Sequence, residues 1–354
     1  MYLRGSDFEV GVHSLLFQPE FYLFDFDPRA GLTRFLVMRE EILEQAPFID
    51  IRVERMAQAS FRVSTDELMS LEGQHAIERP PVNYIFHHSF VCSTLLARCL
   101  NQIDAFFSLK EPWILRRLAD TKRAAPLAEA DWREKFRQYN ALLSKEFSAG
   151  RSTLIKATNV ANNLVVDVVR LMPASRILYL WSDLRSFLVS NLKKNAETQQ
   201  KMPRLYKAFA SDSDFGKRFS QFADARGASL LRVCALIWVA NLYSLQRVVG
   251  EHPNAAVSTL EMGALLNEPL VSLQKTSEYF GHTPSQQELG LMTHRDIMQR
   301  NAKDPRQQYG NEVRREEAQK IDAANRAEID AVLDWIDPVI AELGLVDFMR
   351  GHAV

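Results

Sequence analysis

Residues 82–100 place two histidines and a Ser-Thr pair between a short apolar run and an amphipathic run, which suits binding of a phosphate or sulfate group. The apolar run Tyr84-Ile85-Phe86 predicts a strand, and Ser93-Thr94 opens a helical pattern. Backbone N–H groups in the first turn of a helix are unpaired and lie at the positive end of its dipole, so they attract anions. The match to the standard phosphate loop is partial, because His87 and Cys92 replace its two glycines and a serine replaces its lysine.

The polar residues of this stretch have structural alternatives. Side chains alternate across a strand end, so one of His87 and His88 is expected to face the core and the other a ligand. Ser93 and Thr94 are either phosphate ligands or simple helix caps, which are favoured there without any ligand. Cys92 is also expected to serve in packing.

Charged or polar residues end the other apolar runs of the chain as well. Glu111 follows the run 105–109, Lys156 follows Thr153–Ile155, and Asp183–Ser190 follows the run that begins at residue 176. In a parallel sheet ligands bind at the carboxyl ends of the strands, so these positions are candidate site residues. The alternative for Glu111 is interaction with the dipole of the following helix, and for Lys156 a surface ion pair.

Short apolar runs alternate with helical patterns along most of the chain. Such alternation predicts βαβ crossovers and a mostly parallel sheet covered by helices on both faces. The runs cover residues 84–86, 105–109, 153–155, 176–183 and 255–260. The sequence therefore predicts an α/β fold.

Residues 1–80 have a different pattern. The turn-forming cluster at residues 27–31 separates two apolar runs, which predicts a hairpin. The two runs are residues 21–26 and 32–38, and short helical patterns follow at 39–45 and 64–71. We expect a small α+β extension at residues 1–80 and a main domain at residues 81–354 with a helical C-terminal part.

The composition is that of a folded protein without excess charge. Of the 354 residues 47% are hydrophobic and 25% charged, and the net charge is −1 at pH 7, which argues against a general nucleic-acid surface. Three cysteines without a C-x-x-C pair indicate a reducing compartment and no zinc site. No secretory signal is visible, and the longest apolar stretch, Leu230–Leu245, contains Arg232. We therefore expect a cytoplasmic protein without a membrane span.

The order of these motifs resembles the P-loop sulfotransferase superfamily, specifically its bacterial sulfotransferase-like branch. Residues 87–96 are similar to the family's loop H-x-x-[RK]-x-G-[ST]-T-L-L, and residues 180–190 to its segment l-x-R-D-P-r-d-x-x-x-S. Residues 259–281 resemble the later E-x-L…P…L…F-L-G stretch, and residues 302–309 resemble a loop on the phosphosulfate side. The resemblance extends over residues 82–310.

The resemblance implies a P-loop NTPase-like sheet of five parallel strands and 3′-phosphoadenylyl sulfate as the donor. It implies in-line transfer of a sulfuryl group to a hydroxyl or amine of a small molecule or carbohydrate, without a metal. Glu111 matches the position of a carboxylate that takes the acceptor's proton. The residues that the resemblance assigns to the donor are Cys92, Ser93 and Thr94 at the 5′-phosphate, and Ser190 with Arg185 at the 3′-phosphate.

The chain departs from the family at residues that matter for catalysis. Phe90 replaces the basic residue that stabilises the leaving phosphate, Cys92 replaces the loop glycine, and Ser182 replaces the arginine of R-D-P. Loss of such a cation removes several kcal/mol of transition-state stabilisation unless another cation takes its place. Lys303 is the preferred substitute, since a lysine on a mobile loop can reach a phosphate. The other candidates are His87, His88 and Lys156.

Three functions therefore fit the sequence. The first is a sulfotransferase, and the second is a catalytically impaired nucleotide-binding or scaffold protein that kept the fold, which Phe90 favours. The third is a metal-dependent nucleotide hydrolase or kinase, because Asp183 follows an apolar strand, although the loop lacks the lysine of such enzymes. Binding of adenosine 3′,5′-bisphosphate separates the first two functions, and magnesium-dependent binding of ATP identifies the third.

Overall fold

The chain divides into two compact units of comparable size. The computed structural model describes residues 2–5, 8–75, 79–125, 127–147, 150–222, 225, 227–302, 304 and 306–354. Unit 1 comprises Met1–Ile85 and Leu100–Arg176, and unit 2 comprises Phe86–Cys99 and Ile177–Val354. The expected N-terminal extension belongs wholly to unit 1, and the division between the units falls within a strand.

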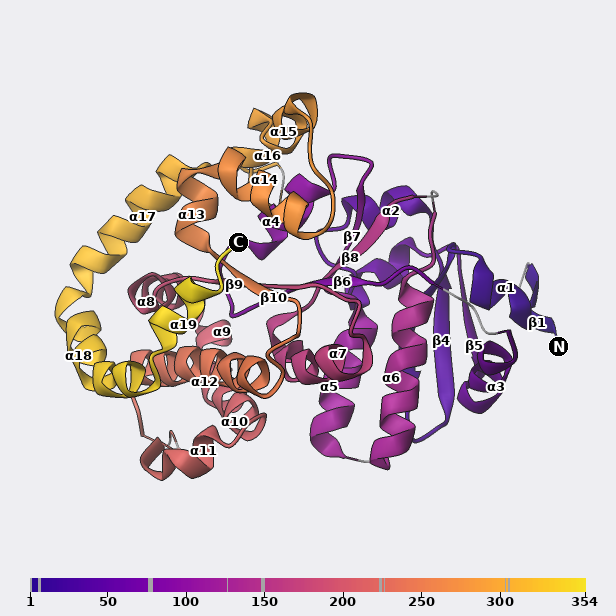
Figure 1. The fold of residues 1–354 in the computed structure, drawn as a ribbon, viewed down its shortest axis with the longest axis horizontal. Helices are drawn as coiled ribbons and strands as arrows, with labels where there is room; N and C mark the ends of the chain where they lie inside the picture. Colours follow the sequence, from indigo (N-terminus) through magenta and orange to yellow (C-terminus); the bar gives the residue numbers. More distant parts are fainter. Residues whose placement is uncertain are drawn as a thin grey trace. The chain divides into compact units, whose positions relative to one another are not determined.

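Five parallel strands form the main sheet, in the order β10-β9-β6-β8-β7 (Figure 1). The strands are β6 (Asn83–His87), β7 (Phe106–Lys110), β8 (Ser152–Lys156), β9 (Ile177–Trp181) and β10 (Val257–Glu261). All residues of β6, β7 and β9 are buried, as is typical of parallel strands covered on both faces. The predicted α/β fold with a five-stranded parallel sheet is confirmed.

The helices of unit 1 follow its strands in the predicted alternation. They are α5 (Trp113–Ala124), α6 (Glu129–Leu143), η2 (Asn159–Leu164) and α7 (Val165–Leu171). Helix α6 ends at Leu143, and Lys145, two residues further on, turns into the interior. Its Nζ donates hydrogen bonds to the carbonyl oxygens of Leu15, Gln18 and Phe21. Lys145 thereby attaches the end of α6 to the N-terminal extension.

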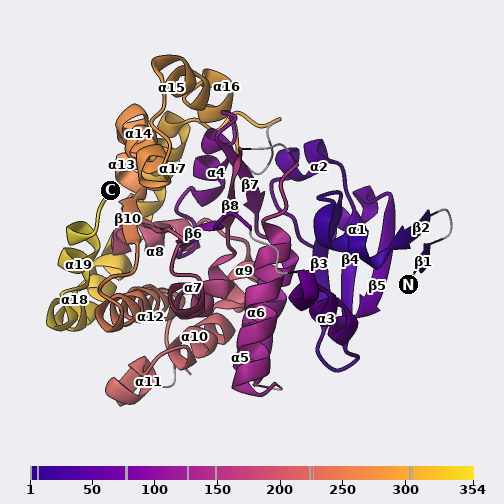
Figure 2. The same cartoon turned by 45° about the vertical axis from the view of Figure 1, so that its right-hand side comes forward.

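The N-terminal extension contains its own antiparallel sheet (Figure 2). The sheet consists of β3 (Phe21–Asp27), β4 (Leu32–Val37) and β5 (Ala59–Ser64). The predicted hairpin at residues 21–38 is therefore confirmed. The other elements of the extension are β1 (Tyr2–Gly5), β2 (Phe8–Gly11), α1 (Val12–Phe17), α2 (Glu40–Gln45), η1 (Ile51–Met56) and α3 (Thr65–His75).

Unit 2 is built around the long apolar helix α12 (Leu230–Glu251). This helix packs against α8 (Leu184–Leu192), α10 (Met202–Ser211), α18 (Arg326–Leu343) and α19 (Leu345–Gly351). By length and composition α12 could cross a membrane, but 78% of its most apolar window is buried inside the protein. It is a core helix, as the sequence predicts. The helices that follow the strands and the loop are α4 (Ser93–Leu100), α8 (Leu184–Leu192), α13 (Met262–Asn267) and α14 (Pro269–Tyr279). The others are α9 (Ala196–Gln200), α10 (Met202–Ser211), α11 (Phe215–Arg218), η3 (Ser220–Phe222), α15 (Gln286–Met292), α16 (Arg295–Met298), α17 (Asn311–Ala324), α18 (Arg326–Leu343) and α19 (Leu345–Gly351).

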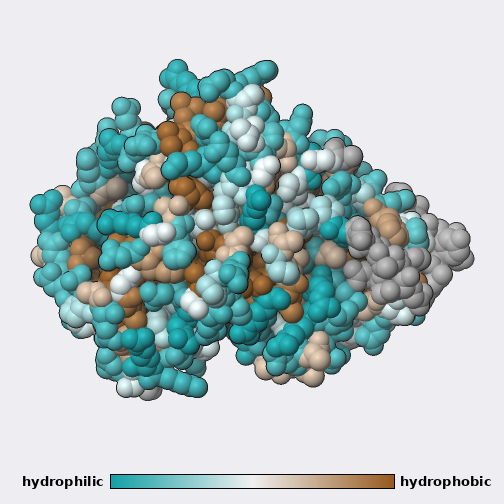
Figure 3. Space-filling model, viewed as in Figure 1, coloured by the Kyte–Doolittle hydropathy of each residue, from teal (hydrophilic) through white to brown (hydrophobic). Residues whose placement is uncertain are grey.

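Apolar side chains also lie on the surface of unit 2, over α14 and α15. Figure 3 shows brown surface in this part of the molecule, and the exposed side chains there include Leu270, Val271 and Leu291. Single exposed apolar residues are normal on folded proteins, so they receive no functional assignment.

Candidate functional site

The turn between β6 and α4 adopts a backbone conformation that glycine usually supplies. Phe90 has a φ of 66° and Cys92 a φ of 60°, both in the left-handed region, where a side chain is strained. Non-glycine residues persist in this region mainly where the surrounding structure enforces it, and such positions cluster at functional sites. Cys92 therefore adopts a turn conformation that glycine usually supplies, in spite of its Cβ.

The first turn of α4 offers unpaired backbone donors. The first helical hydrogen bond runs from the N–H of Leu96 to the carbonyl oxygen of Cys92, at 3.0 Å. The N–H groups of Ser93, Thr94 and Leu95 donate to no atom in the part of the chain that the structure describes. Unpaired donors at the positive end of a helix dipole are a common binding site for phosphate and sulfate groups. Among the described residues, no protein atom occupies the donors on which the predicted anion site depends.

The two histidines before the turn are both buried, which differs from the expected alternation of core and ligand. His87 is 5% exposed and His88 0%. The Nε2 of His88 accepts a hydrogen bond from the N–H of Ser182 at 2.9 Å, and its Nδ1 lies 3.1 Å from the carbonyl oxygen of Ser89. Burial lowers the pKa of His88 to about 4, so the ring is neutral at pH 7. Both ring nitrogens are engaged with the backbone, and His88 positions the loop within unit 2.

Because its pKa is low, His88 is expected to make the folded state sensitive to acid. Between its unfolded pKa near 6.5 and its folded pKa of about 4, the unfolded chain binds a proton that the folded chain does not. Stability is therefore lost as the pH falls through this window, by up to about 3 kcal/mol from this residue. Urea unfolding of His88→Gln should show a flatter dependence from pH 7 to pH 4 than the wild type. The control is His294→Gln, at an exposed histidine, which should keep the wild-type slope.

Two cations in unit 2 that the sequence did not single out lie at the turn. The Nη1 of Arg314, on α17, is 2.9 Å from the Sγ of Cys92, and its guanidinium lies over the ring of Tyr309 at 5.1 Å. Lys194 lies just after α8, and its Nζ is 4.3 Å from the centre of the Phe90 ring. Arg314 forms no ion pair with a carboxylate among the described residues. The turn thus has neighbouring positive charges that come from other segments of unit 2.

The sequence offered little to identify these cations. Arg314 is distant from the loop in sequence and comes close only because α17 packs beside it in unit 2. The one available indication was a basic pair, Arg314-Arg315, in the first turn of a helix that follows Gly310. Lys303, the cation that the sequence favoured, lies outside the described residues, so its role stays a prediction.

The residues expected at the donor's 3′-phosphate differ in their surroundings. Arg185 forms ion pairs with Asp322 and Asp330, each at 2.7 Å, and these carboxylates raise the pKa of its guanidinium. To bind a phosphate it would have to exchange these partners. Ser190 is half-buried in α8. Asp183, the residue behind the kinase hypothesis, caps α8 by accepting a hydrogen bond from the N–H of Ser186 at 2.9 Å.

Glu111 and Lys156 form an ion pair at the carboxyl ends of β7 and β8, within unit 1. The side chain of Lys156 is 1% exposed and that of Glu111 is 21% exposed. Glu111 has a φ of 54°, and its N–H donates to the carbonyl oxygen of Lys156 at 2.7 Å. Because Lys156 is buried, its ion pair holds the carboxylate of Glu111 in a fixed geometry. The left-handed backbone conformation of Glu111 costs conformational energy, which the surrounding structure must offset. Like the turn after β6, the end of β7 thus has a strained backbone, and here it fixes a partly exposed carboxylate.

Comparisons with known proteins give similarity to solved structures alone. No protein-family model matches the chain, and no curated protein matches it. A sulfotransferase domain from the curacin biosynthetic pathway is 14% identical, with a TM-score of 0.43, covering 70% of this chain and 98% of that one. A sulfotransferase from Alicyclobacillus acidocaldarius is 11% identical, with a TM-score of 0.34, covering 73% and 97%. The sulfotransferase STF9 from Mycobacterium avium is also 11% identical, with a TM-score of 0.39, covering 77% and 82%. Because the scores are below 0.5, the proposals below rest on the residues of this chain.

Proposed function

We propose that the chain is a sulfotransferase that uses 3′-phosphoadenylyl sulfate as the donor. The observation that carries the proposal is the left-handed turn at Cys92, followed by the N–H groups of Ser93 and Thr94, which have no hydrogen-bond acceptor among the described residues. The similarity of residues 87–96 to the sulfotransferase loop supports the same assignment. In this proposal the free N–H groups and the hydroxyl of Thr94 bind the donor's 5′-phosphate, and Ser190 and Arg185 contribute at its 3′-phosphate.

The proposed reaction transfers a sulfuryl group from the donor's phosphate to an acceptor oxygen or nitrogen. The acceptor atom forms a bond to sulfur while the bond between sulfur and the bridging oxygen breaks, and its electron pair goes to the phosphate. Adenosine 3′,5′-bisphosphate leaves with the added negative charge, which a nearby cation stabilises. Arg314 is suited to this, since its guanidinium lies at the turn without a carboxylate partner among the described residues. Lys303 is proposed as a second contributor.

Glu111 is the proposed acceptor of the proton. A partly exposed carboxylate can accept the proton that the acceptor loses as its bond to sulfur forms. Lys156 holds Glu111 in place through their ion pair. The expected acceptor is a hydroxyl or amine compound.

Calorimetric titration with adenosine 3′,5′-bisphosphate tests the proposed function. We expect one site on the wild type, and a roughly 10- to 100-fold weaker site on Thr94→Val, since a hydrogen bond to a charged group contributes about 1.5–3 kcal/mol. The matched control is Thr276→Val, because Thr276 is also buried in unit 2 and its hydroxyl has no hydrogen-bond partner among the described residues. Absence of any binding would leave the scaffold alternative, and magnesium-dependent ATP binding in its place would favour a hydrolase or kinase.

A further inference from the structure

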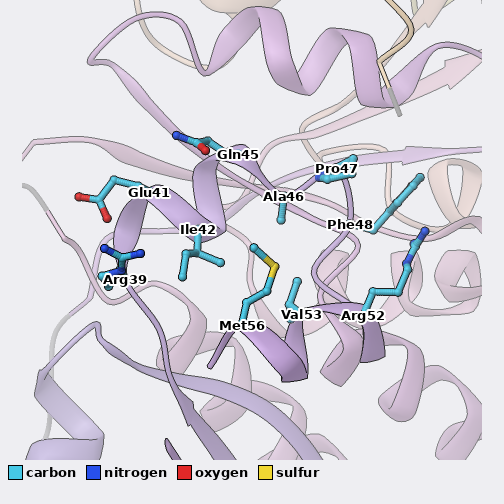
Figure 4. Close-up of a pocket in the computed structure, with 10 residues that line it drawn as sticks. All are labelled: Arg39, Glu41, Ile42, Gln45, Ala46, Pro47, Phe48, Arg52, Val53 and Met56. Atoms are coloured by element: carbon cyan, nitrogen blue, oxygen red, sulfur yellow. The ribbon is translucent and has the colours of Figure 1, made fainter. Parts of the chain in front are cut away.

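A pocket of about 400 Å³ lies within the N-terminal extension of unit 1, between α2 and η1. Figure 4 shows the side chains of Ile42, Val53 and Met56 close together on one side of it, and these three residues form an apolar wall. The volume is within the range of sites for small molecules. The pocket is therefore suited to enclose the aliphatic group of a small ligand.

Hydrogen bonds and ion pairs fix both elements that form the pocket. The Nζ of Lys110 donates to the carbonyl oxygen of Glu44, near the C-terminal end of α2, at 2.7 Å. Arg151 forms ion pairs with Glu40 and Glu44 of the same helix, at 2.7 and 2.6 Å. Asp50 is the N-cap of η1, and its carboxylate accepts a backbone hydrogen bond from the first turn of this helix at 3.0 Å. A site with walls that are already fixed loses little conformational entropy when a ligand binds.

Two opposite charges lie at the same end of the pocket. Arg39 is the N-cap of α2 and Glu41 lies in the first turn of this helix, and Figure 4 shows both side chains at the end away from Phe48. Neither side chain forms an ion pair or a hydrogen bond with the other or with any residue that the structure describes. At the opposite end the charges compensate each other, because the guanidinium of Arg52 donates two hydrogen bonds to the carboxylate of Asp50 at 2.7 and 2.6 Å. A ligand thus meets one available cation and one available anion at the same end.

We propose that this pocket binds a free α-amino acid with an aliphatic side chain, such as leucine. The carboxylate of the ligand pairs with the guanidinium of Arg39, and its ammonium group pairs with the carboxylate of Glu41. Its side chain packs against Ile42, Val53 and Met56, which removes apolar surface from water.

A ligand with both charges fits this end better than a ligand with one. An apolar carboxylic acid would bring its negative charge beside Glu41, and an apolar amine would bring its positive charge beside Arg39, so each would meet repulsion. The pocket lies wholly within unit 1, and the inference does not rest on the proposed transfer of a sulfuryl group. It assigns a binding function to the N-terminal extension.

Calorimetric titration of the full chain with L-leucine and two blocked derivatives tests the inference. N-acetyl-L-leucine keeps the carboxylate and lacks the ammonium group, whereas L-leucinamide keeps the ammonium group and lacks the carboxylate. We expect the wild type to bind L-leucine about fivefold more tightly than either derivative, the size of effect that is typical of a charge pair near the surface.

Crossed substitutions separate the two charges. Arg39→Gln should bind L-leucine no more tightly than L-leucinamide, while it still prefers L-leucine to N-acetyl-L-leucine. Glu41→Gln should show the reverse pattern, which a merely structural effect of either substitution would not produce. The matched controls are Arg55→Gln and Glu67→Gln, at exposed residues of the extension that do not line the pocket, and both should keep the wild-type preferences.

The location of the site is tested with Met56→Trp. Met56 is 48% exposed, so an indole there can fill the mouth of the pocket without disturbing the core, and we expect at least fivefold weaker binding of L-leucine. Ile51→Trp is the control, because Ile51 lies in the same helix, is 57% exposed and does not line the pocket. The proposal would be overturned by absence of saturable binding at millimolar L-leucine, by equal affinities of the wild type for all three compounds, or by equal affinities of Met56→Trp and Ile51→Trp for L-leucine.

Discussion

Arg314→Met is expected to weaken binding of adenosine 3′,5′-bisphosphate by roughly 10- to 100-fold. The reason is that the guanidinium beside the turn is a charged donor, and a hydrogen bond between charged groups contributes about 1.5–3 kcal/mol. Its Nη1 lies 2.9 Å from the Sγ of Cys92, so a phosphate held by the N–H groups of Ser93 and Thr94 comes within its reach. Calorimetry on the purified variants measures the effect.

The neighbouring Arg315 supplies the control for Arg314. Arg315 lies on the same helix, is exposed, and donates to the Oδ1 of Asn267 at 3.2 Å. Arg315→Met removes the same charge from the chain, so it reports any effect of net charge alone. If Arg314→Met binds the bisphosphate as the wild type does while Lys303→Ala does not, the substitute cation is Lys303 and the assignment of Arg314 is wrong.

Glu111→Gln is expected to lower kcat by about 10²–10⁴-fold, the usual contribution of a general base. Affinity for adenosine 3′,5′-bisphosphate should stay within twofold, because the side chain is assigned to the acceptor and not to the donor. The measurement is release of the bisphosphate from 3′-phosphoadenylyl sulfate in the presence of a hydroxyl or amine compound as the acceptor. A loss of kcat without a loss of donor affinity separates a role in proton transfer from general misfolding.

Glu261→Gln is the matched control for the carboxylate. Glu261 also ends a strand of the main sheet, at β10, and begins the helix that follows. It carries no proposed role, so its substitution should leave kcat close to the wild-type value. Equal turnover by Glu111→Gln and the wild type would contradict the assignment of the base.

The sequence was sufficient to predict the five strands of the main sheet and the hairpin, but not β1, β2 or β5. Every residue of β6 and β9 is buried, so their apolar runs are nearly continuous and easy to recognise. The hairpin of β3 and β4 was predictable because turn-forming residues separate its two runs. The C-terminal end of helix α6 was not predictable. Beyond this end Lys145 donates hydrogen bonds to carbonyl oxygens of the N-terminal extension, and a local sequence pattern does not encode such a contact.

The candidate site was only partly predictable. The loop and the carboxyl ends of the strands follow from local order, and so Ser93, Thr94 and Glu111 were identified. The contact of Arg314 with the turn could not be predicted, since it depends on packing between segments distant in sequence. The left-handed backbone conformation at Cys92 was also not predicted from the sequence, because it is unusual for any residue with a side chain.

The most direct test is a crystal structure of the chain with adenosine 3′,5′-bisphosphate bound. We predict that the oxygens of the 5′-phosphate lie about 3 Å from the backbone nitrogens of Ser93 and Thr94, the usual distance for such hydrogen bonds. We also predict that the guanidinium of Arg314 contacts the same phosphate. A bisphosphate bound elsewhere, with these backbone nitrogens facing solvent or protein atoms, would contradict the proposed anion site and the sulfotransferase function with it.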